Sequence, residues 1–343
     1  MTGALLRWYD QERRILPWRE DPTPYHVWIS EIMLQQTRVE AVIGYYERFL
    51  EELPDVCALA EAEEERLLKL WQGLGYYSRA RNLRKAAGQI MERHGGVIPS
   101  DPAELAKLAG IGEYTAAAIA SIAYQVRVPS VDGNLLRVCA RVRGYEESIR
   151  TPKAKKVAQA YFLELLPEDR PGDVNQALMD LGATICLPNG TPDCGHCPWQ
   201  SYCEAHRTGR ELAIPVREEK RSRAIDRKTV LVIRAENSEG EFRYAIRRRP
   251  DRGLLAGLYE FPNTDGHLTE AEAAEACRGL GFRPAGVTRL ADAKHVFTHR
   301  EWHMRGYLID AEPVDPAEGI LLVSSRELAD TYSVPAAFAA FQP

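Results

Sequence analysis

Four cysteines lie close together in the chain, with the spacing C-x7-C-x2-C-x5-C: Cys186, Cys194, Cys197 and Cys203. Four thiolates this close in sequence are typical ligands of a soft metal ion or an iron–sulfur cluster. Zinc sites usually contain two C-x2-C pairs, whereas this stretch has one, although His196 and His206 could also bind zinc. The spacing favours an iron–sulfur cluster by a small margin and leaves zinc open.

A single glutamate, Glu31, stands in the apolar stretch VWISEIMLQQT. Partial loss of hydration among Ile29, Ile32 and Met33 would raise the pKa of its carboxyl group. Such a group can hold a proton near neutral pH and act as a general acid. The alternative is a glutamate on the polar face of a helix, solvated or paired with Arg38. For an isolated glutamate this alternative is the more common case, so Glu31 needs support from the rest of the chain.

Residues 105–134, LAKLAGIGEYTAAAIASIAYQVRVPSVDGN, predict two helices joined by a glycine turn. The turn is Gly110-Ile111-Gly112, and the backbone N–H groups of Gly110 and Gly112 beside a helix N-terminus could bind a phosphate. Tyr114 lies just past the turn, and Asp132 begins a third helix. A C-cap glycine and an N-cap aspartate would produce the same pattern without any function.

Residues 73–83, GLGYYSRARNL, combine a glycine turn, adjacent tyrosines and alternating arginines. An aromatic side chain such as Tyr76 can insert between bases while arginines contact phosphates, so this stretch suits a nucleic acid. Gln35 and Gln36 add polar groups after the apolar stretch around Glu31. The alternative is a pair of core tyrosines followed by a solvated helix.

The composition is that of an ordinary globular chain large enough for two domains. Of the 343 residues 45% are hydrophobic and 27% charged. Apolar runs are too short to span a membrane, and we expect no signal peptide. A net charge of −5 argues against a generally basic surface but allows a local one. The seven cysteines, an odd number, suggest a reducing compartment. A basic group follows Asp132 in the sequence: Arg137, Arg141, Arg143, Arg150, Lys153, Lys155 and Lys156.

The periodicity of the apolar residues divides the chain into two domains. Residues 1–206 read as mostly α-helical, residues 207–228 are charged and read as a linker, and residues 229–343 read as a small α+β domain. In this last part we expect strands at 229–234, 242–246 and 302–309, and a helix at about 268–280.

The first domain resembles the helix-hairpin-helix DNA glycosylases of the endonuclease III superfamily, and within it the MutY-type adenine DNA glycosylases. The matching stretches follow the order of that family and cover nearly the whole domain: LPWR (16–19), ISEIMLQQTRVE (29–40), GLGYYSRARNL (73–83), LAGIGEYTA (108–116), VDGNLLRV (131–138), VNQALMDLGA (174–183) and the four-cysteine loop 186–203. The resemblance implies a [4Fe-4S] cluster. The family spacing is C-x6-C, and the additional residue here falls in the turn-rich LPNGTPD, where we expect it to be absorbed.

One position separates the subfamilies. Enzymes of the endonuclease III type carry a nucleophilic lysine two residues after the second glycine of the hairpin, and here that position is Tyr114. The resemblance therefore implies a monofunctional glycosylase, without a covalent-lysine lyase step.

The second domain resembles the Nudix-like C-terminal domain of the same family, through LLAGLYEFP at 254–262. A working Nudix site needs a helix carrying several carboxylates for magnesium, and AAEACRGLGF lacks that set. We therefore expect a recognition module. Phe297, Thr298 and His299 match the loop with which family members sense 8-oxoguanine, usually Phe-Ser-His, and Thr298 keeps the hydroxyl group.

The resemblance implies hydrolysis of the N-glycosidic bond of adenine mispaired with 8-oxoguanine, or with guanine, in double-stranded DNA. Glu31 would act as the acid, Asp132 would stabilise the sugar cation, and Tyr114 and Asn134 would orient them. The substrate-contacting residues would be Arg14, Trp18, Arg19, Leu34, Gln35, Gln36, Tyr76, Gln176 and the loop Phe297-Thr298-His299. Two alternatives are a related glycosylase for thymine or uracil opposite guanine and a non-catalytic lesion-binding protein. We expect a monomer, away from membranes, in the cytoplasm of a bacterium and associated with its nucleoid.

Overall fold

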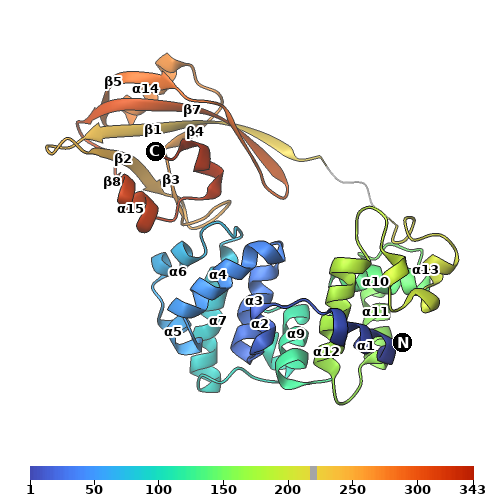
Figure 1. Cartoon of the computed structure of the whole chain (residues 1–343). Helices are drawn as coiled ribbons and strands as arrows, with labels where there is room; N and C mark the ends of the chain where they lie inside the picture. Colours follow the sequence, from blue (N-terminus) through green and yellow to red (C-terminus); the bar gives the residue numbers. More distant parts are fainter. Residues whose placement is uncertain (217–221) are drawn as a thin grey trace. The chain divides into compact units, whose positions relative to one another are not determined.

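The computed structural model describes residues 1–216 and 222–343, which form two compact units (Figure 1). The first unit contains residues 1–62 and 81–216 of the described chain. The second unit holds residues 63–80 together with 222–343. Residues 217–221, in the middle of the expected linker 207–228, lie outside the described residues. Within the described ranges, no helix has the length and apolar character that a membrane crossing requires.

The first unit is helical, as expected. Its helices begin at good N-terminal signals: Thr23 caps α3 by accepting from the His26 N–H, and Thr151 caps α11 in the same way, each followed by proline. The elements are α1 (Thr2–Glu12), α2 (Pro17–Glu20), α3 (Pro24–Leu34), α4 (Val39–Glu52), α5 (Val56–Glu61), α8 (Pro102–Leu105), α9 (Glu113–Tyr124), α10 (Gly133–Arg143), α11 (Pro152–Leu165), α12 (Pro171–Asp180), a π-turn (Leu181–Ile185), 3-10 turns (Cys194–His196 and Gln200–Tyr202) and α13 (Glu204–Arg207), with α7 (Ser78–His94) running in from residue 78.

Helix α3 is the central element of the first unit. Each residue from Val27 to Met33 is buried, and α3 contacts both α4 and α9, while α9 also contacts α12. A helix buried on all sides excludes water from any polar group that it carries. Glu31 is such a group.

A second part of the first unit gathers α1, α10, α11 and α12 around an apolar core that includes Leu5, Leu135, Phe162 and Trp199. The indole N–H of Trp199 donates to the Met1 carbonyl at 3.1 Å, so the four-cysteine loop is attached to the start of the chain. Three cysteines of that loop pack against the same core. The core therefore positions the loop and Asp132, at the start of α10, together.

The glycine turn joins α8 to α9 as predicted, but only one of its glycines has a left-handed backbone. Gly110 has φ +74°, and a Cβ atom there would lie 2.6 Å from the Cβ of Asn82. Gly112 has φ −88° and is the N-cap of α9, where no described side chain caps the helix. The first backbone N–H groups of α9 thus lack an intrahelical acceptor.

The second unit is built on one mixed sheet, in the order β3-β2-β1-β7-β5, with β4 on β1, β6 on β7 and β8 on β2. Strands β1 and β7 are parallel, and the other pairs are antiparallel. The elements are α6 (Glu64–Leu70), β1 (Ala224–Glu236), β2 (Phe242–Arg248), β3 (Tyr259–Glu260), β4 (Asn263–Asp265), α14 (Glu270–Gly279), β5 (Phe282–Arg289), β6 (Ala293–Val296), β7 (Arg300–Pro313), β8 (Ile320–Ser324), α15 (Ser325–Asp330) and a 3-10 turn (Ala336–Phe341).

Both faces of this sheet are covered. Along β1, Val230 and Val232 belong to one apolar core with Phe338, whereas Leu231 and Ile233 belong to another with Cys277 of α14. This period of two is what separates the two faces of a strand. The three expected strands and the helix at 268–280 are present. Strand β1 is longer than expected and begins at Ala224, inside the expected linker.

Residues 63–80 belong in space to the second unit, although the sequence places them within the first domain. Gln72 donates from Nε2 to the Val334 carbonyl at 2.8 Å, and Lys69 donates to the Tyr332 carbonyl at 3.3 Å. The Tyr259 hydroxyl donates to Glu65 at 3.0 Å, which together with burial raises the pKa of Tyr259 to about 12. These polar contacts attach α6 and the turn after it to the sheet.

Candidate active site

A cavity of about 210 Å³ in the first unit collects most of the predicted site residues. They come from five helices and the loops between them, and they are Arg14, Trp18, Arg19, Glu31, Leu34, Tyr114, Asp132, Asn134 and Gln176. The turn before α9, the N-terminus of α10 and the inner face of α12 thus meet α3 at one place. A pocket in which several titratable groups converge is the usual form of a catalytic site.

Glu31 is buried, with 7% of its surface exposed. Burial raises its pKa to about 7, and the negative charge of Asp132 adds to the rise. A hydrogen bond with Tyr114 and the positive charge of Arg19 act in the opposite direction. The carboxyl group is therefore poised to hold or release a proton near neutral pH.

Asp132 is the N-cap of α10 and faces the same cavity. Its Oδ1 accepts from the Leu135 N–H at 2.8 Å, and its Oδ2 accepts from the Asn134 amide at 3.0 Å. Burial raises the pKa of Asp132, and these hydrogen bonds limit the rise. The N-cap role and the cavity-facing role coexist, because the carboxylate has two oxygens and the helix N-terminus uses one of them.

A chain of hydrogen bonds leads from Asp132 to the four-cysteine loop. Asn134 accepts at Oδ1 from Arg137 at 3.0 Å, and Arg137 donates to the Cys186 carbonyl at 2.8 Å and to the Gly182 carbonyl at 2.7 Å. Arg137 and Arg141 are both buried. Their expected role in a basic surface is therefore wrong: in α10 they point inward and tie the helix to the loop.

Asp180 is a site residue that our sequence reasoning missed. It is almost completely buried, and it pairs with Arg14 at 2.6 Å and with Arg19 at 2.7 Å. Burial acts to raise the pKa of Asp180, but the hydrogen bonds and charges of Arg19 and Arg14 lower it below its usual value. Asp180 lies in VNQALMDLGA, one turn after Gln176 on α12, and that i, i+4 spacing was the available signal.

The remaining predicted residues lie outside this cavity. Gln35 contacts Thr115, with 3.5 Å between its Nε2 and the threonine Oγ1. Gln36 is exposed and has φ +61°, a conformation that is uncommon for a residue with a side chain. Gly110 and Gly112 form the turn before α9. Gln36 and the glycines are thus surface features of the first unit.

Tyr76 and the predicted reading loop meet in the second unit. Phe297, Thr298 and His299 form the turn between β6 and β7, closed by a bond from the Phe297 N–H to the Arg300 carbonyl at 2.9 Å. The Tyr76 hydroxyl lies 2.6 Å from Oγ1 of Thr298. Tyr76 is 49% exposed and has φ +46°. Its backbone conformation is of the kind that is retained where surrounding contacts impose it.

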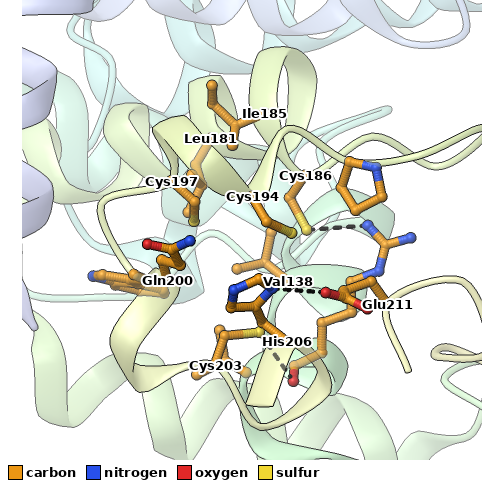
Figure 2. A pocket seen from close by; sticks show the side chains of 14 residues that line it. Val138, Leu181, Ile185, Cys186, Cys194, Cys197, Gln200, Cys203, His206 and Glu211 are labelled. Carbon is orange, nitrogen blue, oxygen red and sulfur yellow. Dashed lines mark hydrogen bonds and ion pairs between the residues drawn. The ribbon is translucent and has the colours of Figure 1, made fainter. Parts of the chain in front are cut away.

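The four predicted metal ligands face one small cavity in the first unit (Figure 2). All four are free thiols, and Arg141 donates to the sulfur of Cys186 at 3.2 Å. Burial raises the pKa of Cys197 to about 12 and also raises the pKa of Cys194 and Cys203. Buried thiols of this kind become thiolates when a metal neutralises their charge.

His206 and Glu211 close one side of the cysteine cavity, with 2.7 Å between the His206 Nδ1 and a Glu211 oxygen (Figure 2). Their ligand atoms lie within 4.8 Å of the sulfur of Cys194. His196, the other candidate zinc ligand, pairs with Asp193 at 2.8 Å and is mostly exposed.

Comparisons with known proteins agree with this fold. Residues 29–168 match the HhH-GPD superfamily of base excision DNA repair proteins, and residues 229–341 match the NUDIX domain. The first part is similar to a thermostable thymine-DNA glycosylase structure, with a TM-score of 0.55 and 26% identity, covering 60% of this chain and 95% of that one. The fold of a complex of endonuclease III with DNA is also similar, with a TM-score of 0.52 and 21% identity over 61% of this chain and 94% of that one. The matched domains and the fold thus define the class of protein, a helix-hairpin-helix DNA glycosylase of base-excision repair.

Curated relatives narrow the class. The adenine DNA glycosylase of Mus musculus is 37% identical over 86% of this chain and 67% of its own length. That of Rattus norvegicus is 36% identical over 92% of this chain and 72% of its own length. The chain belongs to the adenine DNA glycosylase family.

Proposed function

We propose that this adenine DNA glycosylase acts on adenine paired with 8-oxoguanine, or with guanine, and that it hydrolyses the N-glycosidic bond without a lyase step. The observation that carries the catalytic part of the proposal is Glu31, buried in the cavity with a pKa of about 7, beside Asp132 in the same cavity.

The residue types suggest a mechanism of two carboxyl groups. Adenine must leave the base stack to enter a cavity of this kind. Glu31 would protonate N7 of the base, which makes adenine a better leaving group, and its raised pKa keeps the proton available. Bond cleavage leaves positive charge on the sugar, and Asp132 would stabilise or trap it. Glu31, then a carboxylate, would take a proton from the attacking water.

Two further groups would orient the carboxyl groups. Tyr114, whose pKa is raised by burial and by the charge of Glu31, stays a neutral hydroxyl that can hydrogen-bond to Glu31. Asn134 donates to Oδ2 of Asp132, which favours the ionised form of that carboxyl group. Asp180 holds Arg14 and Arg19 at the edge of the cavity, where they would contact the base.

The monofunctional part of the proposal is supported by the cavity lining. Among the described residues that line it, the cationic side chains are arginines, and no lysine is present. Arginine stays protonated and is a poor nucleophile, so a covalent imine with the sugar lacks a suitable amine here. Water is then the nucleophile that attacks the sugar.

Recognition of 8-oxoguanine is supported by the contact between Tyr76 and Thr298. It brings an exposed aromatic ring and a hydroxyl group together at a turn of the second unit. A ring of this type can wedge into the stack while the hydroxyl group reads a base edge.

We further propose that Cys186, Cys194, Cys197 and Cys203 bind a [4Fe-4S] cluster. The four cysteines face one small cavity, and Arg141 donates to the sulfur of Cys186. Four thiolates at one site are the ligand set that such a cluster requires. A cluster bound there would cross-link the loop. Metal analysis of protein purified without oxygen should give about four iron atoms per chain; one zinc atom and no iron would contradict the assignment.

The function is tested with a duplex that contains adenine opposite 8-oxoguanine. We expect strand scission at the adenine only after alkali, and none with Glu31→Gln. Scission without alkali would contradict the monofunctional proposal. Parallel duplexes with thymine opposite guanine and adenine opposite guanine serve as controls, and cleavage of the thymine duplex alone would overturn the substrate assignment.

A further inference from the structure

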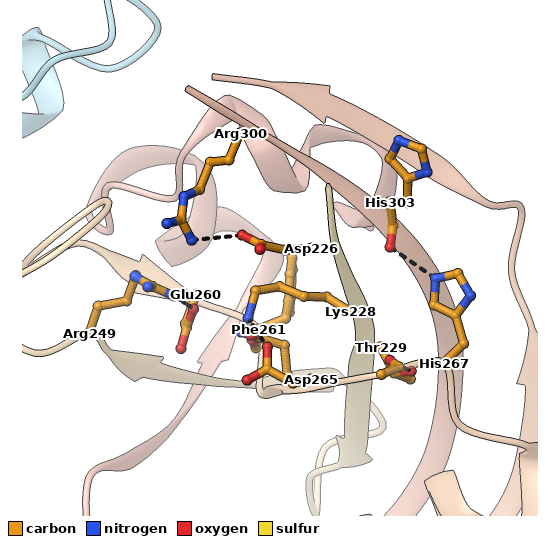
Figure 3. Close-up of polar contacts among 12 residues, drawn as sticks. Asp226, Lys228, Thr229, Arg249, Glu260, Phe261, Asp265, His267, Arg300 and His303 are labelled. Carbon is orange, nitrogen blue, oxygen red and sulfur yellow. Dashed lines mark hydrogen bonds and ion pairs between the residues drawn. The ribbon is translucent and has the colours of Figure 1, made fainter. Parts of the chain in front are cut away.

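The second unit contains a further cavity, of about 730 Å³, which the proposed reaction does not use. Figure 3 shows several of the charged side chains that line it, among them Lys228, Asp265 and Arg300. The cavity lies where the starts of β1 and β7 meet β4 and the loop after β2. Its volume is in the range of small-molecule binding sites. Because the unit has its own sheet and core, this cavity exists independently of the first unit.

Three of the cationic side chains that line this cavity each have an acidic partner. Lys228 pairs with Asp265, Arg300 with Asp226, and Arg249 with the buried Glu260. An anion binds such a lining where it replaces the carboxylate of a weak pair.

Lys228 is held in place while its counter-ion is not. The ammonium group lies 5.1 Å from the centre of the Trp302 ring and 2.8 Å from Asp265, and the Lys228 side chain is 15% exposed. The Asp265 side chain is 89% exposed. An ion pair with one exposed partner is weak, so an anion can replace the carboxylate without moving the lysine.

Arg300 provides a second cation at the opening of the cavity. Its side chain is 50% exposed and contacts Asp226 at 2.8 Å, so it too has an exchangeable partner. Arg249 differs, because it pairs with the buried Glu260 (Figure 3). Its guanidinium group also lies 5.6 Å from the centre of the Trp302 ring. Guanidinium and ammonium groups with freed donors are the usual ligands of phosphate oxygens.

The cavity opens beside the predicted reading loop. Arg300 directly follows His299, and the Ala224 N–H at the start of β1 donates to the His299 carbonyl at 3.2 Å. A DNA strand that meets Thr298 with one base thus carries its neighbouring phosphates past Lys228 and Arg300. We propose that this cavity binds a backbone phosphate of the DNA strand that the loop contacts. The identity of the bound strand rests on the proposed function, because that function places the 8-oxoguanine strand at the loop. Phosphate binding itself does not require 8-oxoguanine.

The test uses the salt dependence of DNA binding by the full chain. In a Glu31→Gln background, which prevents turnover, binding to the duplex with adenine opposite 8-oxoguanine is measured by anisotropy at several salt concentrations. Lys228→Gln and Arg300→Gln should each reduce the slope of log K against log salt by about one phosphate contact. The reduction should be the same when guanine replaces 8-oxoguanine.

Two controls make the result specific. Lys228→Arg keeps the charge and should keep the slope, and Arg283→Gln, on β5 with a side chain that is 70% exposed, should leave it unchanged. The proposal would be overturned if Lys228→Gln and Arg300→Gln both gave the same slope of log K against log salt as the parent protein. So would binding of dGMP that depends on Arg300 while the DNA slope stays constant, because the cavity would then serve a free nucleotide. A changed slope with equal affinity for both duplexes would uphold phosphate binding and count only against lesion reading.

Discussion

At the scale of single residues, the site depends on the loss of water around charged groups. Glu31, Asp132 and Asp180 are three acidic residues in or beside one cavity, yet their pKa values move in different directions. Glu31 and Asp132 have burial as the main cause and move up, whereas Asp180 has two arginines and moves down. The raised pKa of Glu31 suits the proton transfer proposed for it, and the lowered pKa of Asp180 keeps a negative charge beside Arg14 and Arg19.

The raised pKa of Glu31 predicts how both activity and stability depend on pH. The proposed mechanism uses the acid form of Glu31, so the rate of base release should fall as pH rises above about 7. For stability, a carboxyl group whose folded-state pKa is above its unfolded value of 4.5 favours folding at low pH and loses this contribution as pH rises through 7. The free energy of unfolding of Glu31→Gln, relative to that of the parent protein, should therefore be greater at pH 8 than at pH 5, by up to about 3 kcal/mol. Melting temperatures of both proteins at the two pH values provide the check, and a pH-independent difference would contradict it.

Asp180 predicts a large and specific loss of stability. Asp180→Asn removes the counter-ion of Arg14 and Arg19 and should cost about 3–5 kcal/mol, because breaking one partner leaves buried charge uncompensated. Asp10→Asn breaks a more exposed pair with Arg170 and should cost less than about 1 kcal/mol. Chemical denaturation of the two variants distinguishes these losses, and equal losses would count against the role given to Asp180.

At the scale of elements, helix termini and turns place the polar side chains of the cavity. Asp132 serves α10 as its N-cap, and the turn before α9 places Tyr114. Gln36 follows a helix and Tyr76 follows a turn, and both residues have a left-handed backbone conformation. Their side chains are directed away from the core. The elements thus separate a buried set of residues from an exposed one.

The glycine turn predicts different outcomes for its two glycines. Gly110→Ala should lower the melting temperature, since the alanine Cβ would meet Asn82 at 2.6 Å and φ is +74°. We expect a cost of about 1–2 kcal/mol from the backbone alone. Gly112→Ala has open space and an ordinary φ, so its fold should be retained, with the amide still available to a phosphate. Thermal melting and DNA affinity of both variants test this, and an equal destabilisation would contradict the steric argument.

At the scale of the whole molecule, the chain order and the spatial grouping differ. Residues 63–80 leave the first domain in sequence and join the second unit in space, through Gln72, Lys69 and Tyr76. Tyr76 and Thr298 therefore both belong to the second unit, where they contact each other. We infer that lesion preference and base removal depend on separate sets of residues.

Thr298 provides the test of that separation. Thr298→Ala removes one hydroxyl group next to Tyr76 and should lower the preference for 8-oxoguanine over guanine by about fivefold, the equivalent of one hydrogen bond of about 1 kcal/mol. The rate at a saturating concentration of the adenine–guanine duplex should stay constant. Thr298→Ser, which keeps the hydroxyl group, is the matched control, and a fall in both rates would contradict the separation.

Much of this protein was readable from local patterns. The apolar neighbours of Glu31 indicated that it could be buried, and the change from a helical period to a period of two predicted the α+β second domain. Strand β5, FRPAGVTR, was missed because most of its residues are exposed at a sheet edge, so it lacks the alternation that marks a half-buried strand.

The sequence alone determined the family, the pair of carboxyl groups and the four thiols, because these depend on residue type and short spacing. Only the tertiary structure decided which charges are neutralised. Arg137 and Arg141 read as surface cations, and their burial follows from the carbonyl groups of a loop more than 40 residues away. Asp180 lies more than 160 residues from Arg14 and Arg19, and residues 63–80 contact strands and turns far along the chain. Interactions over such separations depend on the packing of whole helices and sheets, which no local pattern contains.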